Sequence, residues 1–301
     1  MRGIEQRTAM SLRIGYMSDL HLEFENGREW IGDGAEEFQQ FKAARAAVPG
    51  HPDTGPVLAD LAGSVDCMVL AGDIWTGVRG IGYCAAVGKY LGVPVVTVAG
   101  NHEFYGHEVG ALRREMAAEA AAVGVHFLDD ARADLQIGGR RVAILGSTLW
   151  ASMDGARPSD VVANLDRARG LADYDSIFVG SRELVPEDTL ALHRAARTWL
   201  EREIPCARAD ADSVVVVTHH APLMAAVVDP ERNAVDFAYA SPLGAMIEAC
   251  RPDAWIFGHT HAAAFRQDMA GVPIVSAARG YVSQSRGWNF RPQVLELRGH
   301  Q

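Results

Sequence analysis

Five short apolar runs in this chain each end directly before residues that commonly bind metal ions. The runs are four to six residues long and rich in β-branched side chains, which is typical of buried parallel strands. They span residues 12–17, 67–71, 94–99, 213–218 and 254–257. Ligands of an open α/β sheet gather at the carboxyl ends of its strands. The residues that follow these runs are therefore expected to meet at one place.

Those following residues supply carboxylates, one amide and several imidazoles. The candidate metal ligands are Asp19, His21, Asp73, Asn101, His219, His259 and His261. Residues two apart in an extended segment point to the same side, so Asp19 and His21 can both face one ion, as can His259 and His261, if the strand ends stay extended. One carboxylate can give an oxygen to each of two ions, and Asp73 is best placed to do so. The mixed donor set suits Mn²⁺, Fe, Zn²⁺ or Co²⁺ and is too rich in nitrogen for Ca²⁺.

The order of these motifs resembles that of the calcineurin-like metallophosphoesterases over residues 12–280. The matching segments read SDLH, AGDIW, AGNHEFYG, THHAP and FGHTHAA. The resemblance implies an α/β chain folded as a four-layer αββα sandwich, in which helices flank two mixed β-sheets and a dinuclear metal site lies at the strand ends. It implies that one ion is held by Asp19, His21, Asp73 and His261, and the other by Asp73, Asn101, His219 and His259. His219 is preferred to His220 because the family ligand usually follows its strand directly.

The same resemblance implies a metal-dependent phosphohydrolase that acts on a phosphodiester, with a phosphomonoester as the less favoured alternative. Two ions about 3.5–4 Å apart lower the pKa of a bridging water, so that hydroxide can attack phosphorus in line. His102 is the expected catalytic residue and would protonate the leaving group, although it could instead only orient Asn101. Glu103 could orient His102 or face water. Arg279 could bind the substrate phosphate or form a structural salt bridge, and His220 could contact substrate or be structural.

Three other members of this superfamily provide alternatives. Protein Ser/Thr phosphatases carry Asp-Arg-Gly shortly after their GD motif, whereas residues 74–78 here read IWTGV. That departure removes the Asp expected to support His102, whose partner must come from elsewhere. A repair-type nuclease would need a nucleic-acid surface, which the acidic chain does not indicate. Non-catalytic scaffolds of this fold tend to lose the His that follows the Asn, and His102 is present.

Composition limits the class of partner and the cellular compartment expected of the protein. The net charge is −10, from 28 basic and 38 acidic residues among 301, which argues against a general polyanion binder and favours a small phosphate-ester substrate. The four cysteines are dispersed, as expected for free thiols of a cytoplasmic protein. No apolar run approaches the length of a membrane span. The natural substrate, the metal, the oligomeric state and whether translation starts at Met10 are left open.

The remaining pattern predicts a single domain over residues 12–301 after a disordered extension, residues 1–11. Helices are expected at 77–91, 110–123 and 186–203, and a hairpin at 135–145 around two glycines. Short strands at 125–128, 263–267, 272–276 and 293–297 suggest a βαβ first half and an antiparallel-rich second half. Residues 22–62, 150–185 and 223–241 read as irregular insertions that would carry substrate specificity.

Overall fold

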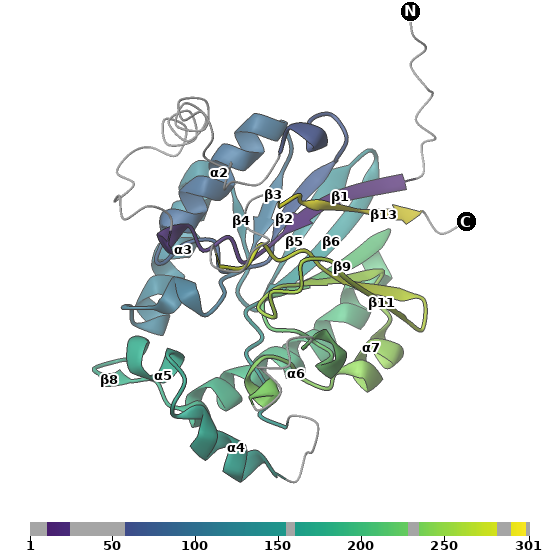
Figure 1. Cartoon of the computed structure of the whole chain (residues 1–301). Coiled ribbons are helices and arrows are strands. Elements are labelled where there is room, and N and C mark those ends of the chain that lie inside the picture. Colours follow the sequence, from purple (N-terminus) through teal and green to yellow (C-terminus); the bar gives the residue numbers. More distant parts are fainter. Residues whose placement is uncertain (1–10, 25–57, 155–159, 228–234, 282–289, 299–301) are drawn as a thin grey trace, which may run out of the picture.

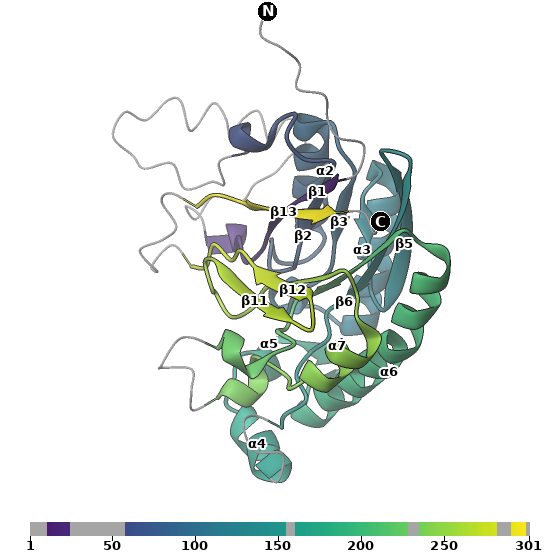
Figure 2. The ribbon, with the colours of Figure 1, turned by 90° about the vertical axis from the view of Figure 1, so that its right-hand side faces the viewer.

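Two β-sheets form the centre of the molecule (Figures 1 and 2). The computed structural model describes residues 11–24, 58–154, 160–227, 235–281 and 290–298. The five-stranded sheet has the order β13-β1-β2-β3-β4. Its strands are β1 (Ser11–Met17), β2 (Cys67–Leu70), β3 (Val95–Thr97), β4 (His126–Phe127) and β13 (Gln293–Arg298). Strands β1 to β4 are parallel, whereas β13 returns antiparallel beside β1.

The six-stranded sheet has the order β11-β12-β10-β9-β6-β5. Its strands are β5 (Ala131–Ile137), β6 (Arg140–Ser147), β9 (Ser213–Thr218), β10 (Ala254–Phe257), β11 (Phe265–Met269) and β12 (Val272–Ser276). The four middle strands are parallel, and only the edge strands β5 and β11 are antiparallel to their neighbours. The prediction of an antiparallel-rich second half was therefore wrong. Helical crossovers return the chain between β6, β9 and β10, so these strands run in one direction.

Helices cover the outer face of each sheet (Figure 1). Helices α2 (Arg79–Leu91) and α3 (Val109–Val123) pack on the five-stranded sheet, and α6 (Pro186–Asp210) and α7 (Gly244–Cys250) on the six-stranded sheet. Helix α6 was expected to end at 203 but continues through Pro205. Ile204 and Ala207 lie buried against the six-stranded sheet, and this burial outweighs the missing proline N–H.

Side chains alternate between two apolar cores. In β6, Val142 and Ile144 pack in the core shared by both sheets, whereas Ala143 and Leu145 pack against the outer helices. Strand β9 alternates in the same way. Both faces of the parallel strands are therefore buried, which confirms the predicted four-layer αββα sandwich.

Local predictions had mixed outcomes. The hairpin around Gly138 and Gly139 is confirmed, and both glycines have positive φ as a two-residue turn requires. Ser11, assigned to the N-terminal extension, is the first residue of β1, while residues 1–10 lie outside the described residues. None of the helices within the described ranges is long and apolar enough to cross a membrane.

The insertion at 150–185 is more regular than predicted. It contains α4 (Val161–Ala168), α5 (Asp173–Ser176) and a small hairpin of β7 (Phe178–Val179) and β8 (Arg182–Glu183). Its Asp and Gly content obscured the apolar spacing of α4. Residues 25–57 and 228–234 of the other two insertions lie outside the described residues. The described parts of these two insertions contain four short 3₁₀ helices: η1 (Leu22–Phe24), η2 (Ala59–Leu61), η5 (Met224–Ala226) and η7 (Asp236–Ala238).

Candidate metal centre

All seven predicted ligands lie in loops that directly follow strands of the two sheets. The five-stranded sheet contributes those after β1, β2 and β3, and the six-stranded sheet those after β9 and β10. Six of the seven residues are buried, and His261 is intermediate as a whole residue although its side chain is only 6% exposed. The parallel carboxyl ends thus bring residues from distant parts of the sequence to one edge of the sandwich.

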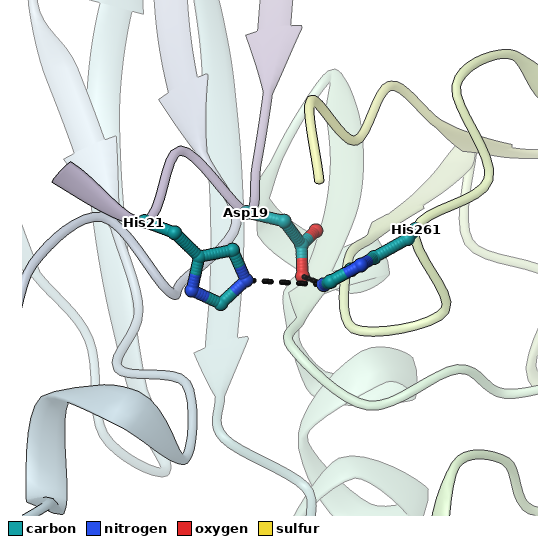
Figure 3. A group of neighbouring side chains, drawn as sticks. All are labelled: Asp19, His21 and His261. Atoms are coloured by element: carbon teal, nitrogen blue, oxygen red, sulfur yellow. Dashed lines mark hydrogen bonds and ion pairs between the residues drawn. The ribbon is translucent and has the colours of Figure 1, made fainter. Parts of the chain in front are cut away.

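Asp19, His21 and His261 form the first group of converging ligand atoms. Figure 3 shows the three side chains pointing toward one another from two loops. His21 Nε2 lies 3.0 Å from His261 Nε2, and His261 Nε2 lies 3.6 Å from Asp19 Oδ1. The ligand atoms of all three lie within 4.8 Å of one another, close enough to hold one ion.

Asp73, His219 and His259 form the second group. His219 Nε2 lies 3.3 Å from Asp73 Oδ2 and 3.2 Å from the Asn101 Oδ1 atom. Asp73 Oδ2 also lies 3.7 Å from His21 Nε2 of the first group. Asp73 therefore stands between the two groups, in the position expected of a bridging carboxylate.

His219 and His220 occupy different environments. The Nδ1 atom of His219 lies 2.8 Å from the Ala71 carbonyl, which leaves Nε2 facing the second group. His220 Nδ1 lies 3.1 Å from the Thr148 carbonyl, and its ring stands 4.1 Å from the His259 ring. His220 belongs to neither ligand group. A contact between His220 and substrate stays a prediction.

The ligand loops are not extended as predicted. Asp19, His21, Asp73, His259 and His261 all have φ between 47° and 66°, in the left-handed region. Asp19 and His21 meet because the chain turns tightly after β1, not because alternate residues of a strand share a face. His259 and His261 belong to different groups, so they do not face one ion together as an extended strand end would allow. Left-handed conformations of non-glycine residues store strain of about 1–3 kcal/mol each and occur mainly at functional sites.

Close approach of these turns explains two of the motif glycines. A Cβ atom at Gly100 would lie 2.0 Å from Asp73 Oδ1 and 2.7 Å from its backbone nitrogen. Gly72 has a φ of +82°, and a Cβ there would lie 2.5 Å from His219 Nδ1. Only glycine at positions 72 and 100 therefore allows the loops after β2 and β3 to pack around the Asp73 carboxylate.

Glu103 binds these loops together. Its buried carboxylate accepts hydrogen bonds from the backbone N–H groups of Asp73 (2.9 Å), Ile74 (2.8 Å) and Gly100 (2.7 Å). Burial and the nearby Asp73 charge raise the pKa of Glu103 to about 7. Both roles considered from the sequence, orienting His102 and facing water, were wrong, because the side chain points inward at the loops.

His102 has a carboxylate partner that sequence reasoning missed. Its Nδ1 lies 3.0 Å from Glu23 Oε1, and the same oxygen lies 3.2 Å from His21 Nδ1. On the other side of the ring, His102 Nε2 lies 3.3 Å from the Tyr281 hydroxyl. Glu23 follows His21 by two residues, but no sequence pattern links it to His102.

Asn101 also has an unpredicted partner. Its side-chain N–H donates to Asp173 Oδ1 at 2.8 Å, while its Oδ1 faces His219. Asp173 lies in the insertion at 150–185. Burial raises the pKa of Asp173, although the hydrogen bonds from Tyr105 and Asn101 oppose that rise.

Charges within the centre are strongly coupled. Burial, the largest single effect, would lower the pKa of His219, but the Asp73 and Asp19 charges and the hydrogen bonds to Asp73 and the Ala71 carbonyl together raise it to about 10. Burial would raise the pKa of Asp73, and the charges of His219 and His102 hold it well below its usual range. Burial would also lower the pKa of His102, but the Asp73 charge and the Glu23 carboxylate raise it to about 9. Such buried anionic oxygens beside imidazole nitrogens form a donor set that fits divalent metal ions.

Arg279 lies next to the first group but points into the protein. It is 2% exposed, and its guanidinium donates to the Leu20 carbonyl at 2.7 Å, between Asp19 and His21. Its backbone N–H donates to the Ser18 carbonyl. These contacts fix the first ligand loop, and binding of substrate phosphate by Arg279 stays a prediction.

The chain is similar to one known protein family and, in its fold, to a solved structure. A family model described as calcineurin-like phosphoesterase matches residues 12–263. No curated protein sequence matches the chain. The crystal structure of phosphopantetheinyl hydrolase (PptH) from Mycobacterium tuberculosis is 15% identical, with 94% of this chain and 96% of that chain covered and a TM-score of 0.61. At this identity, the likeness concerns the fold alone.

Two further solved structures are more distantly similar. A putative 5′-nucleotidase from Staphylococcus aureus is 14% identical, with 97% of this chain and 55% of that chain covered and a TM-score of 0.45. The calcineurin-like phosphoesterase YfkN from Bacillus subtilis is 13% identical, with 89% and 81% covered and a TM-score of 0.41.

The close packing at Gly100 gives a first prediction. Gly100→Ala places a methyl group against Asp73 and should displace that carboxylate, so we expect Mn²⁺ affinity to fall by at least about tenfold. Isothermal titration with Mn²⁺ measures the loss. Gly110→Ala in α3 is the matched control, because its added Cβ would have no neighbour nearer than 3.4 Å. Unchanged affinity in Gly100→Ala would contradict the packing described here.

Removal of metal should also destabilise the fold. Ions that bind only the folded chain stabilise it by mass action, by about 2.7 kcal/mol at a free concentration one hundred times Kd. We therefore expect a chelator to lower the melting temperature, as followed by circular dichroism. Asp73→Ala should melt at the same temperature with and without Mn²⁺. An unchanged melt of the unsubstituted protein after verified metal removal would rule out a pre-formed site.

Proposed function

The chain belongs to the calcineurin-like phosphoesterase family, and we propose that it is a phosphodiesterase that acts on a small phosphate-ester substrate at a dinuclear metal centre. The observation that carries the proposal is the position of Asp73, whose Oδ2 lies 3.7 Å from His21 Nε2 and 3.3 Å from His219 Nε2. One carboxylate is thus within reach of ions held by either group. The family itself establishes only the coarser activity, hydrolysis of phosphate esters.

The residues assigned to each ion follow from the two groups. Asp19, His21 and His261 would hold one ion and Asn101, His219 and His259 the other, with Asp73 shared. When bound, two divalent ions such as Mn²⁺, Fe, Zn²⁺ or Co²⁺ supply a water of lowered pKa as nucleophile and neutralise charge on the phosphoryl oxygens.

His102 is proposed as the general acid that protonates the leaving oxygen. Glu23 accepts from its Nδ1, so the proton to be transferred is carried on Nε2. That Nε2 faces the Tyr281 hydroxyl and not a carboxylate. The backbone N–H of His102 donates to Asp73 Oδ1 at 2.9 Å, which ties the position of the acid to the shared carboxylate.

A preference for diesters is supported by the charge of the surroundings. Asp73 and Glu23, whose pKa values are held below their usual range, carry negative charge at the centre. A phosphodiester carries less negative charge than a phosphomonoester dianion and is repelled less by these groups. A cytoplasmic location is also proposed, because the four cysteines are free and a reducing compartment keeps them so.

The substrate class can be tested with two chromogenic esters. We expect the chain to hydrolyse bis-(4-nitrophenyl) phosphate faster than 4-nitrophenyl phosphate in the presence of Mn²⁺, and Asp73→Asn to lose both activities. Faster monoester cleavage would replace the phosphodiesterase with a phosphatase or nucleotidase. Absence of metal-dependent activity on both esters would contradict the proposal and favour the scaffold alternative.

The role of His102 has its own test. His102→Ala should lower kcat by about 10²–10⁴-fold for diesters with an alkyl leaving group, which needs protonation, while Mn²⁺ remains bound. The loss should be much smaller for a nitrophenyl leaving group, which departs readily as an anion. Rates on the two diesters, with metal content measured in parallel, give the comparison. A loss of the same size for both leaving groups would exclude general-acid catalysis by His102.

A further inference from the structure

The insertion at 150–185 reaches the metal centre through one side chain, Asp173. Asp173 is the first residue of α5, which lies outside both sheets beside the β7–β8 hairpin (Figure 1). Its Oδ1 accepts hydrogen bonds from Asn101 Nδ2 at 2.8 Å and from the Tyr105 hydroxyl at 2.7 Å. The carboxylate therefore lies directly behind a metal ligand.

The contact determines which end of the Asn101 amide faces the metal centre. An asparagine amide has an accepting oxygen and a donating nitrogen of nearly equal size, and only the oxygen binds a cation. The Asp173 carboxylate can only accept, so it selects the NH₂ end of Asn101. The opposite end, Oδ1, is then turned toward His219 Nε2, 3.2 Å away.

The insertion is firmly joined to the segment that follows Asn101. The Ser176 carbonyl accepts from the Gly106 N–H at 2.7 Å, and the Phe178 N–H donates to the His107 carbonyl at 3.0 Å. These backbone bonds place α5 and β7 along residues 106–108. These bonds are those expected of a fixed support for the loop that follows β3, rather than of a lid that opens over the centre.

Tyr105 links Asp173 to His102, the proposed general acid. Its hydroxyl donates to Asp173, and its ring stacks on His102 with centroids 4.3 Å apart and planes at 27°. Asp173 thus holds two side chains: Asn101, the proposed metal ligand, and Tyr105, whose ring lies against His102. Its own carboxylate is not among the converging ligand atoms of either group.

We propose that Asp173 is a positioning residue that orients Asn101 for the second metal ion, so that the insertion at 150–185 is an integral part of the metal centre. The inference rests on the proposed function, because it takes Asn101 as a ligand. It assigns the described part of this insertion a role in metal binding, where the sequence predicted substrate specificity.

A double-mutant cycle separates orientation of the amide from other effects. Asp173→Ala and Asp173→Asn are each made in the unsubstituted chain and in an Asn101→Asp background. A carboxylate at position 101 presents an oxygen whichever way it turns, so it needs no partner to orient it. The measurement is calorimetric titration of the chelator-treated full chain with Mn²⁺, which reads affinity and stoichiometry without any substrate.

In the unsubstituted chain, Asp173→Ala should weaken one of two Mn²⁺ sites by about 10–100-fold, the usual range for residues that orient a ligand, and leave the other unchanged. Asp173→Asn keeps one accepting oxygen and should lose less. In the Asn101→Asp background, Asp173→Ala should cause no loss, and removal of a like charge should favour binding. Asp175→Asn, an exposed position on the same helix, is the control and should bind Mn²⁺ normally.

Other outcomes would overturn the inference. Unchanged affinity in Asp173→Ala, or an equal loss in both backgrounds, would show that Asp173 does not act by orienting Asn101. If Asp173→Ala fails to fold by circular dichroism, the same comparison is read from Asp173→Asn. No Mn²⁺ binding by the unsubstituted chain would refute the metal centre and this inference together, whereas the expected cycle without ester hydrolysis would refute only the proposed function.

Discussion

The centre depends on the pairing of one buried carboxylate, Asp73, with imidazoles from both sheets. Asp73 is 1% exposed and lies within 4 Å of His21, from the five-stranded sheet, and of His219, from the six-stranded sheet. An isolated carboxylate buried in this way would be strongly destabilising unless paired and hydrogen-bonded. The relative position of the two sheets is therefore coupled to the geometry of the centre, and neither can change without the other.

The ligand loops are held by hydrogen bonds that run from one loop to the next. The Asp19 carboxylate accepts from the His259 N–H, and Asp73 Oδ1 accepts from the His102 N–H. Glu103 in turn accepts from the Asp73 N–H. Each carboxylate thus satisfies a backbone donor of another loop. These bonds explain how left-handed conformations persist at the ligands, because several independent contacts determine each turn.

The sequence predicted what depends on short stretches of chain and missed what depends on distant pairs. The strand ends and the candidate ligands beside them could be predicted because an apolar run and the residues after it are neighbours in sequence. Glu23 and His102 are 79 residues apart, and Asn101 and Asp173 are 72 apart, so no local pattern joins either pair. The left-handed turns were missed for a related reason, since they follow from packing between loops and not from the residue types within one loop.

Glu23 shows how this chain differs from the pattern expected of the protein Ser/Thr phosphatases. The expected Asp after the GD motif is absent, and Ile74 and Trp75 occupy that stretch as buried apolar residues. Glu23, from the loop after β1, instead places Oε1 between His21 Nδ1 and His102 Nδ1. His21 therefore turns Nε2 toward His261 and Asp73, and His102 turns Nε2 toward the Tyr281 hydroxyl. Because one oxygen serves a metal ligand and the proposed acid together, a shift of either ring changes the hydrogen bond available to the other.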